Sequence, residues 1–275
     1  AKFWTETVND KSGKKEITIS AVRLYYFLQL NGFRTLRDIN AANTRYIQVT
    51  NNVVKQIKAK DVRRFVREWS EERCLNENVR NLIVNSMKFS ETSLENLKEV
   101  ELDFSNFTHN TQLFFFPNNN VEVTPKEIIV HQRGDTAFNH YVWEENVLKH
   151  NFKPLPDMFK LTCLDKENNL YDIDVLDCKS SPIFGYVINT SRLHWRKEME
   201  ERFEDNPEEA KAYAEKHRFC INGEGLTEDE IREQKQNLAN KIFAIGYMLH
   251  RFKSPSRAWA PQAMDNKIGE NGECN

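Results

Sequence analysis

The spacing of apolar and polar residues predicts short strands and helices in turn over the first hundred residues of this 275-residue chain. KFWTETV (2–8) and KEITIS (15–20) have the alternation of two strands. Ser20 then suits the N-cap of a helix whose apolar residues share one face until Gly32. Asn51–Asn52, between RYIQVT and VVKQIK, predicts a two-residue hairpin turn, because asparagine tolerates positive φ.

A second helix is predicted over AKDVRRFVREWSEER (59–73), where apolar residues recur at i, i+3, i+4 and i+7 from Val62. The order strand, helix, hairpin, helix is compatible with a winged-helix-like module, although spacing alone does not fix that topology. Further helices are predicted at 76–88 and 91–99, and a β-rich stretch is predicted at 111–131. The N-terminal module is therefore expected to be mixed, with a winged-helix-like part and a β-rich part.

Pro154 and Pro156 follow an irregular tract, and they place a domain boundary there, with domains at 1–150 and 151–275. A hairpin at 158–176 should open the second domain. The complete fold is predicted to be α+β, with a mainly helical second part.

Three capping signals predict helices in that second domain. Ser181–Pro182 begins a helix expected to run through residue 203, and Asn206–Pro207 begins another. Thr227 and Glu230 form a capping box for the last long helix. The apolar stripe of this last helix is Ile231, Leu238, Ile242, Ile245 and Leu249. A short strand is predicted at 257–264.

Composition narrows the function classes only a little. With 39% hydrophobic and 11% aromatic residues the chain should fold, and its net charge of −2 leaves any nucleic-acid binding to local patches. Five cysteines without a C-x-x-C pair suit neither a disulfide framework nor a zinc site, which favours the reducing cytoplasm. No apolar run is long enough to predict a membrane span.

The clearest local patch of charge is KQIKAKDVRRFVR (55–67), in which only Asp61 opposes six basic residues. On a helix, Arg63 and Arg67 lie one turn apart and Arg64 is adjacent, so they can approach neighbouring phosphates. The alternative is a solvated face paired with nearby glutamates. The candidate DNA-binding residues are Lys55, Lys58, Lys60, Arg63, Arg64 and Arg67.

Two other motifs could carry chemistry. Asp172 and Asp174 alternate on a predicted strand, so both carboxylates point to one side, as two-metal nucleotidyl transfer requires. The same alternation is also the ordinary solvent side of a hairpin. In RLHWRK (192–197), Trp195 with Arg192 or Arg196 could stack on bases, or Trp195 could belong to the core.

The segments SPIFGYVINTSRLHWRKEMEE (181–201), NKIFAIGYMLHRFKSPSRAWAP (240–261) and MDNKIGENGECN (264–275) resemble the stretch that precedes Walker A in superfamily 3 helicases. The resemblance is to the viral and phage primase-helicase type, including the poxvirus-like family, and it extends more loosely over 3–33 and 121–132. It implies a chain that is truncated before an AAA+ core.

What the resemblance implies is a hexameric, ATP-driven DNA helicase whose Walker A motif, ATP and Mg²⁺ would lie beyond residue 275. The fragment would then be non-catalytic and hold no cofactor, and it would bind DNA or support hexamer assembly. One alternative is an archaeo-eukaryotic-type primase using Asp172 and Asp174, since primases occur fused to such helicases. The other is a protein–protein adaptor of a replication complex.

Overall fold

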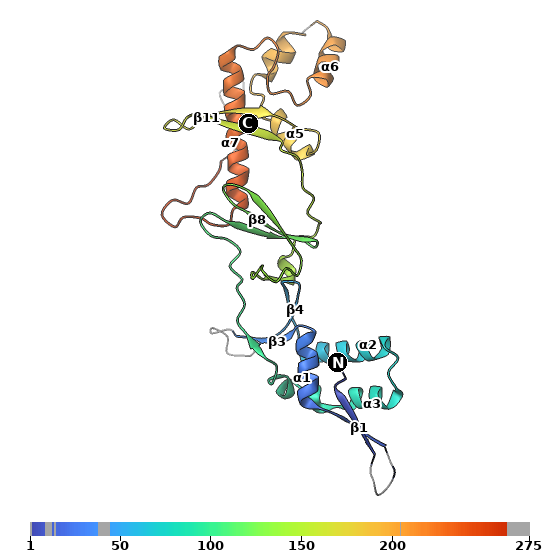
Figure 1. Cartoon of the computed structure of the whole chain (residues 1–275). Helices are drawn as coiled ribbons and strands as arrows, with labels where there is room; N and C mark the ends of the chain where they lie inside the picture. Colours follow the sequence, from blue (N-terminus) through green and yellow to red (C-terminus); the bar gives the residue numbers. More distant parts are fainter. Residues whose placement is uncertain (1, 9–12, 14, 38–44, 204, 263–275) are drawn as a thin grey trace, which may run out of the picture. The chain divides into compact units, whose positions relative to one another are not determined.

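The computed structural model describes residues 2–8, 13, 15–37, 45–203 and 205–262, with the elements labelled in Figure 1. It shows an α+β protein with several separate sheets. The chain divides into two compact units, Ala1–Phe152 and Lys153–Asn275.

Unit 1 begins with the predicted hairpin and helix. Strands β1 (Trp4–Val8) and β2 (Lys15–Ile19) pair antiparallel, and α1 (Ala21–Leu30) follows with Ser20 at its N-cap. A five-stranded sheet has the order β10-β5-β4-β3-β6. Its strands are β3 (Phe33–Leu36), β4 (Arg45–Thr50), β5 (Val53–Gln56), β6 (Glu99–Val100) and β10 (Val142–Trp143).

Helical segments follow β5, and a second sheet comes later in unit 1. The helical segments are α2 (Ala59–Glu72), α3 (Glu77–Asn85), the 3₁₀ turn η1 (Met87–Phe89), α4 (Glu91–Leu94) and the 3₁₀ turn η2 (Glu144–Asn146). The predicted β-rich stretch is confirmed as an antiparallel sheet of β7 (Gln112–Phe115), β8 (Asn119–Val123) and β9 (Ile128–Gln132).

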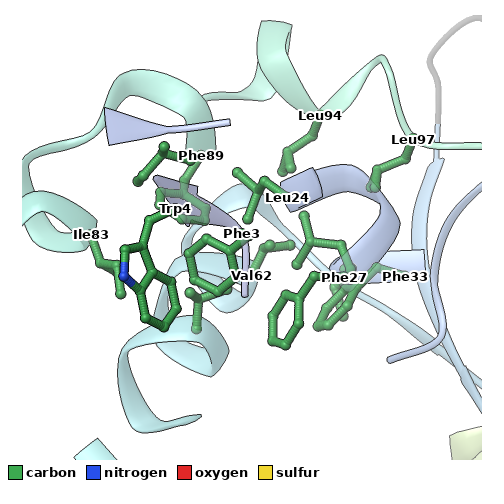
Figure 2. Packing of buried hydrophobic residues seen from close by; sticks show 14 of the residues in the cluster. Phe3, Trp4, Leu24, Phe27, Phe33, Val62, Ile83, Phe89, Leu94 and Leu97 are labelled. Carbon is green, nitrogen blue, oxygen red and sulfur yellow. The ribbon is translucent and has the colours of Figure 1, made fainter. Parts of the chain in front are cut away.

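The largest core of unit 1 lies between the first hairpin and helices α1, α2 and α3 (Figure 2). The predicted stripe of α2 is confirmed, because Val62 and Val66 are fully buried there while Phe65 and Trp69 pack against the cluster. The Phe27 and Trp69 rings meet edge to face with centroids 4.7 Å apart. One face of α2 is therefore fixed by the core, which leaves its opposite face to solvent.

The predicted Asn51–Asn52 turn is also confirmed, with φ of 48° and 69°. Its second residue has a further role that local rules do not predict. The buried Asn52 amide donates hydrogen bonds to the Phe138 and His140 carbonyls at 2.8 and 3.3 Å. These bonds hold the chain where β10 pairs in parallel with β5.

Unit 2 is a hairpin covered by helices. Its elements are β11 (Phe159–Asp165), β12 (Leu170–Val175), α5 (Pro182–Asn189), the π-helix η3 (Arg196–Glu201), α6 (Pro207–Lys216) and α7 (Glu228–Leu249). Ser181, Asn206 and Thr227 each accept a hydrogen bond from the first turn of a helix, which confirms all three predicted helix starts. The core joins Ile173 of β12 to residues of α5 and α7.

The helix predicted from 182 to 203 is interrupted after Asn189, and helical structure resumes as the π-helix η3, so the prediction of one continuous helix is wrong. The Thr190 and Ser191 hydroxyls both donate to the Val187 carbonyl, at 3.1 and 2.7 Å, and the chain leaves the helix there. Trp195 consequently lies off the α5 stripe, and it is half-buried with the Arg192 guanidinium 4.2 Å from its ring.

Two other predictions are corrected. The helix expected at 91–99 is only the single turn α4, because Glu99–Val100 pairs with β3 and tertiary pairing overrides the local pattern. Residues 257–262 of the predicted final strand form no strand, and 263–264 lie outside the described residues.

The stripe predicted for α7 is buried only in part. Leu238 is fully buried and Ile242 packs against the core, whereas Ile245 and Leu249 are 37% and 57% exposed. The periodicity predicted one continuous apolar face along α7. Within unit 2, the core buries only the first half of that face.

Glu230 makes the stability of unit 2 sensitive to acid. Its carboxylate accepts from Lys197 at 2.7 Å and from the Thr227 amide at 2.7 Å. These contacts, with Lys197 the larger, lower its pKa from 4.5 to about 2. The stabilisation is present above the unfolded-state pKa and is lost as pH falls from about 4.5 through 2.

We therefore expect the urea midpoint of unfolding to fall between pH 5 and pH 2, and Glu230→Gln should flatten this dependence. Glu228→Gln, at a first-turn residue for which no such ion pair occurs among the described residues, is the matched control. If Glu230→Gln left the pH dependence of the urea midpoint unchanged, Glu230 would not be the source of the acid sensitivity.

Candidate nucleic-acid interface

The six candidate basic residues occupy three different environments. Lys55 lies on β5, and its ammonium is 3.2 Å from the Glu144 carboxylate, so it is already paired. Lys58 is the N-cap residue of α2. The other four, Lys60, Arg63, Arg64 and Arg67, lie within α2 and are all exposed.

These four residues form one surface, here named the α2 basic face. They step along the helix by three or four residues, on the side opposite the buried Val62 and Val66. Arg67 approaches Glu71 only to 3.8 Å, with both side chains about half exposed, so this pair contributes little. Arg63 donates to the Ser86 carbonyl at 3.4 Å. Within the described ranges, Lys60 and Arg64 form no ion pair.

The distribution of charge along α2 runs against the helix dipole. The basic face runs from Lys60 in the first turn to Arg67 just past the middle of the helix, and Glu68, Glu71 and Glu72 follow it. Asp61 is the only acid of the first turn, and it accepts from the Lys58 amide at 2.9 Å to cap the helix. Cations near a helix N-terminus are unfavourable for the helix itself, and a bound anion there is favourable.

The structure places a further basic residue, Lys88, on the turn η1 beside α2. The turn η1 packs against α2, and Arg63 reaches Ser86, two residues before Lys88. Lys88 therefore lies close to the α2 basic face. Its position depends on the turn between α3 and η1, for which spacing within 55–67 carries no signal.

The Asp172 and Asp174 carboxylates do lie on one side of β12, as predicted, and that side faces α7. Lys235 of α7 places its ammonium 2.8 Å from Asp172 and 3.7 Å from Asp174. The hydrogen bond from Lys235 lowers the pKa of Asp172. A lysine thus neutralises the pair from the direction in which two metal ions would bind, so the geometry gives no support to nucleotidyl transfer here.

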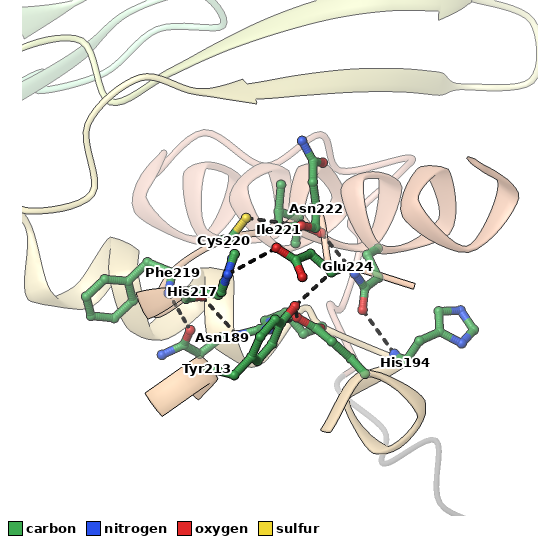
Figure 3. A network of polar contacts seen from close by, with 12 residues as sticks. Asn189, His194, Tyr213, His217, Phe219, Cys220, Ile221, Asn222 and Glu224 are labelled. Atoms are coloured by element: carbon green, nitrogen blue, oxygen red, sulfur yellow. Dashed lines mark hydrogen bonds and ion pairs between the residues drawn. The ribbon is translucent and has the colours of Figure 1, made fainter. Parts of the chain in front are cut away.

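The cluster RLHWRK contributes to a buried polar network (Figure 3). Arg192 bonds to Glu198, and both side chains are almost fully buried. The Tyr213 hydroxyl donates to Glu198 at 2.9 Å and accepts from the Glu224 amide at 3.0 Å. His194 lies 2.9 Å from Glu233. Arg192 therefore serves the fold, and its guanidinium covers one face of Trp195.

No three His, Cys, Asp or Glu side chains of the described residues are grouped so that they could hold a metal ion. None of the helices described is both long and apolar enough to pass through a bilayer. No family model, curated protein or solved structure matches the chain.

Proposed function

We propose that the chain binds DNA through the α2 basic face, as the non-catalytic N-terminal part of a phage-type replication helicase. The observation that carries the proposal is the set of four exposed cations on the side of α2 that the core leaves free. The acids of α2 are the capping Asp61 and the later Glu68, Glu71 and Glu72, of which Glu71 approaches Arg67 to 3.8 Å. Phosphates would relieve the unfavourable charge distribution.

The larger assignment rests on the resemblance of 181–275 to the region before Walker A. Under this assignment, unit 1 would be the winged-helix-like module and unit 2 would lead into an AAA+ core. Binding of ATP and Mg²⁺ and assembly of a hexamer would belong to the complete protein. The contact of Lys235 with Asp172 and Asp174 counts against the primase alternative. The protein–protein adaptor has no specific feature in its favour.

DNA binding should depend strongly on salt. Each phosphate contact contributes about −0.9 to the slope of log K against log salt, so four cations predict a slope of roughly −3 to −4 for duplex DNA. Fluorescence anisotropy with a labelled duplex and a labelled single strand measures this slope.

The triple variant Arg63→Glu, Arg64→Glu, Arg67→Glu should weaken binding at low salt by at least about a hundredfold, and it should reduce the slope by about three. The control Lys166→Glu, Lys179→Glu, Lys211→Glu makes the same charge change at exposed sites of unit 2. Circular dichroism of the triple variant checks that α2 is retained, since the reversal also removes the Arg67–Glu71 contact. If both triple variants lost the same DNA affinity, the assignment of DNA binding to the α2 basic face would be contradicted. If the unaltered protein bound no DNA at low salt, the protein–protein adaptor would be favoured.

A further inference from the structure

A cavity of about 1,140 Å³ lies within unit 2, separate from the α2 basic face. Its walls come from the β11–β12 hairpin, the chain after α5, the end of α6 and the exposed side of α7. This volume slightly exceeds the range of roughly 300–1,000 Å³ that is usual for small-molecule sites.

Lys241 of α7 lies in the wall with its ammonium turned toward the end of α5. The ammonium donates to the Thr190 carbonyl, and no carboxylate of the described residues lies within ion-pair distance of it. Burial lowers the pKa of Lys241, because the cation has lost part of its water. A cation of this kind is compensated when an anion binds beside it.

A second cation lies at the same corner. The Asn189 side chain accepts from the Phe219 amide at 3.3 Å, which ties the Arg218–Phe219 segment to the residue before Thr190. Arg218 is exposed, lines the cavity, and forms no ion pair with the residues described. Lys241 is thus bonded to Thr190, and the residue after Arg218 is bonded to Asn189, so both cations belong to segments held at the end of α5.

The acids of the wall are already engaged. Asp229 pairs with Arg232 at 2.9 Å, and Glu233 lies 2.9 Å from the His194 imidazole. Once the Asp229–Arg232 and Arg192–Glu198 pairs are set aside, Arg218 and Lys241 outnumber the single carboxylate of Glu233, so the net charge of the wall is positive. The wall also contains the rings of Tyr171 and Trp195, both half-buried, and Arg192 covers one face of Trp195. Such rings pack against planar ligands.

We propose that this cavity binds an aromatic phosphate of nucleotide size, with Lys241 and Arg218 at the phosphate and Trp195 or Tyr171 against the ring. Two sources share this chemistry, a free nucleotide and a nucleotide of a single strand. The site uses no residue of α2, so this proposal can be tested independently of the DNA interface proposed above.

Titration with dCMP, followed by calorimetry and by amide NMR shifts, tests the proposal. We expect shifts at Thr190, Arg218 and Lys241, and at least about tenfold weaker binding of deoxycytidine or inorganic phosphate alone. Lys241→Gln should lower the affinity for dCMP by at least about tenfold, and Lys241→Arg should keep part of that affinity. The control Lys211→Gln, at an exposed lysine of α6, should have no effect.

Absence of shifts at millimolar dCMP would overturn the proposal, as would equal binding by Lys241→Gln. If Lys241→Gln fails to fold, the dCMP affinity of Arg218→Gln, a change at an exposed residue, is measured instead. An affinity unchanged by Arg218→Gln overturns the proposal. A short single strand added to the α2 triple-reversal variant separates the sources. Tighter binding of the strand than of dCMP assigns the cavity to nucleic acid, and tighter binding of dCMP assigns it to a free nucleotide.

Discussion

Gly32→Ala should be among the most destabilising single substitutions in the chain. Gly32 has φ of +83°, and a Cβ added to it would lie 2.1 Å from the Val49 carbonyl oxygen. The obstacle is backbone of β4, and it is fixed further by the hydrogen bond from the Val49 amide to the Gly32 carbonyl at 2.9 Å. A rotamer change cannot relieve the clash.

We expect a loss of roughly 2–6 kcal/mol in the free energy of unfolding, from about 1–3 for backbone strain and about 1–3 for overpacking. Urea-induced unfolding of the full chain, followed by tryptophan fluorescence, measures it. Gly13→Ala is the matched control, since Gly13 also has positive φ, at +65°, but has nothing within 4 Å of the added Cβ. It should lose only about 1 kcal/mol. Similar losses in the two variants would show that the close approach of β4 is unimportant.

Glu198→Ala should cost about 3–5 kcal/mol, because it leaves the Arg192 guanidinium buried without its counter-charge. The side chains of Arg192 and Glu198 are only 3% and 0% exposed. Gly223 packs directly on this carboxylate, since a Cβ at Gly223 would lie 2.5 Å from it. Water therefore has no ready access to the cation once the carboxylate is removed.

Chemical denaturation of Glu198→Ala and Arg232→Ala provides the comparison. Arg232 and Asp229 form a pair with 60% and 86% exposed side chains, and losing it should cost about 0–1 kcal/mol. The double variant Arg192→Met, Glu198→Leu should recover part of the loss, since no unpaired charge stays buried. A cost for Glu198→Ala no greater than for Arg232→Ala would refute the role of the buried pair.

Local chemistry predicted the starts of elements well. Ser20, Thr227 and the Asn51–Asn52 turn act through contacts within a few residues, so the sequence alone contains the information. Ends of elements were less predictable. Helix α5 stops at Asn189 where hydroxyls compete for the backbone, and α4 is short because a distant strand takes Glu99–Val100.

The candidate interface shows the same division. Helical spacing correctly grouped Arg63, Arg64 and Arg67 on an exposed surface. The density of basic residues over 55–67 also grouped Lys55 with them, and that residue is separated by its place on β5 and its pairing with Glu144. The bond of Lys235 to Asp172 joins residues far apart in sequence, and no motif predicts it.

The parallel pairing of β10 with β5 bears on the order in which unit 1 folds. The Asn52 amide that holds this junction bonds to a carbonyl 86 residues away, whereas β3, β4 and β5 are joined through neighbouring hairpins. Closing so long a loop costs more entropy than closing a hairpin turn. The edge strand β10, like the other edge strand β6, should therefore dock late onto β3–β5, and the amides of these two strands should exchange with solvent before those of the three central strands.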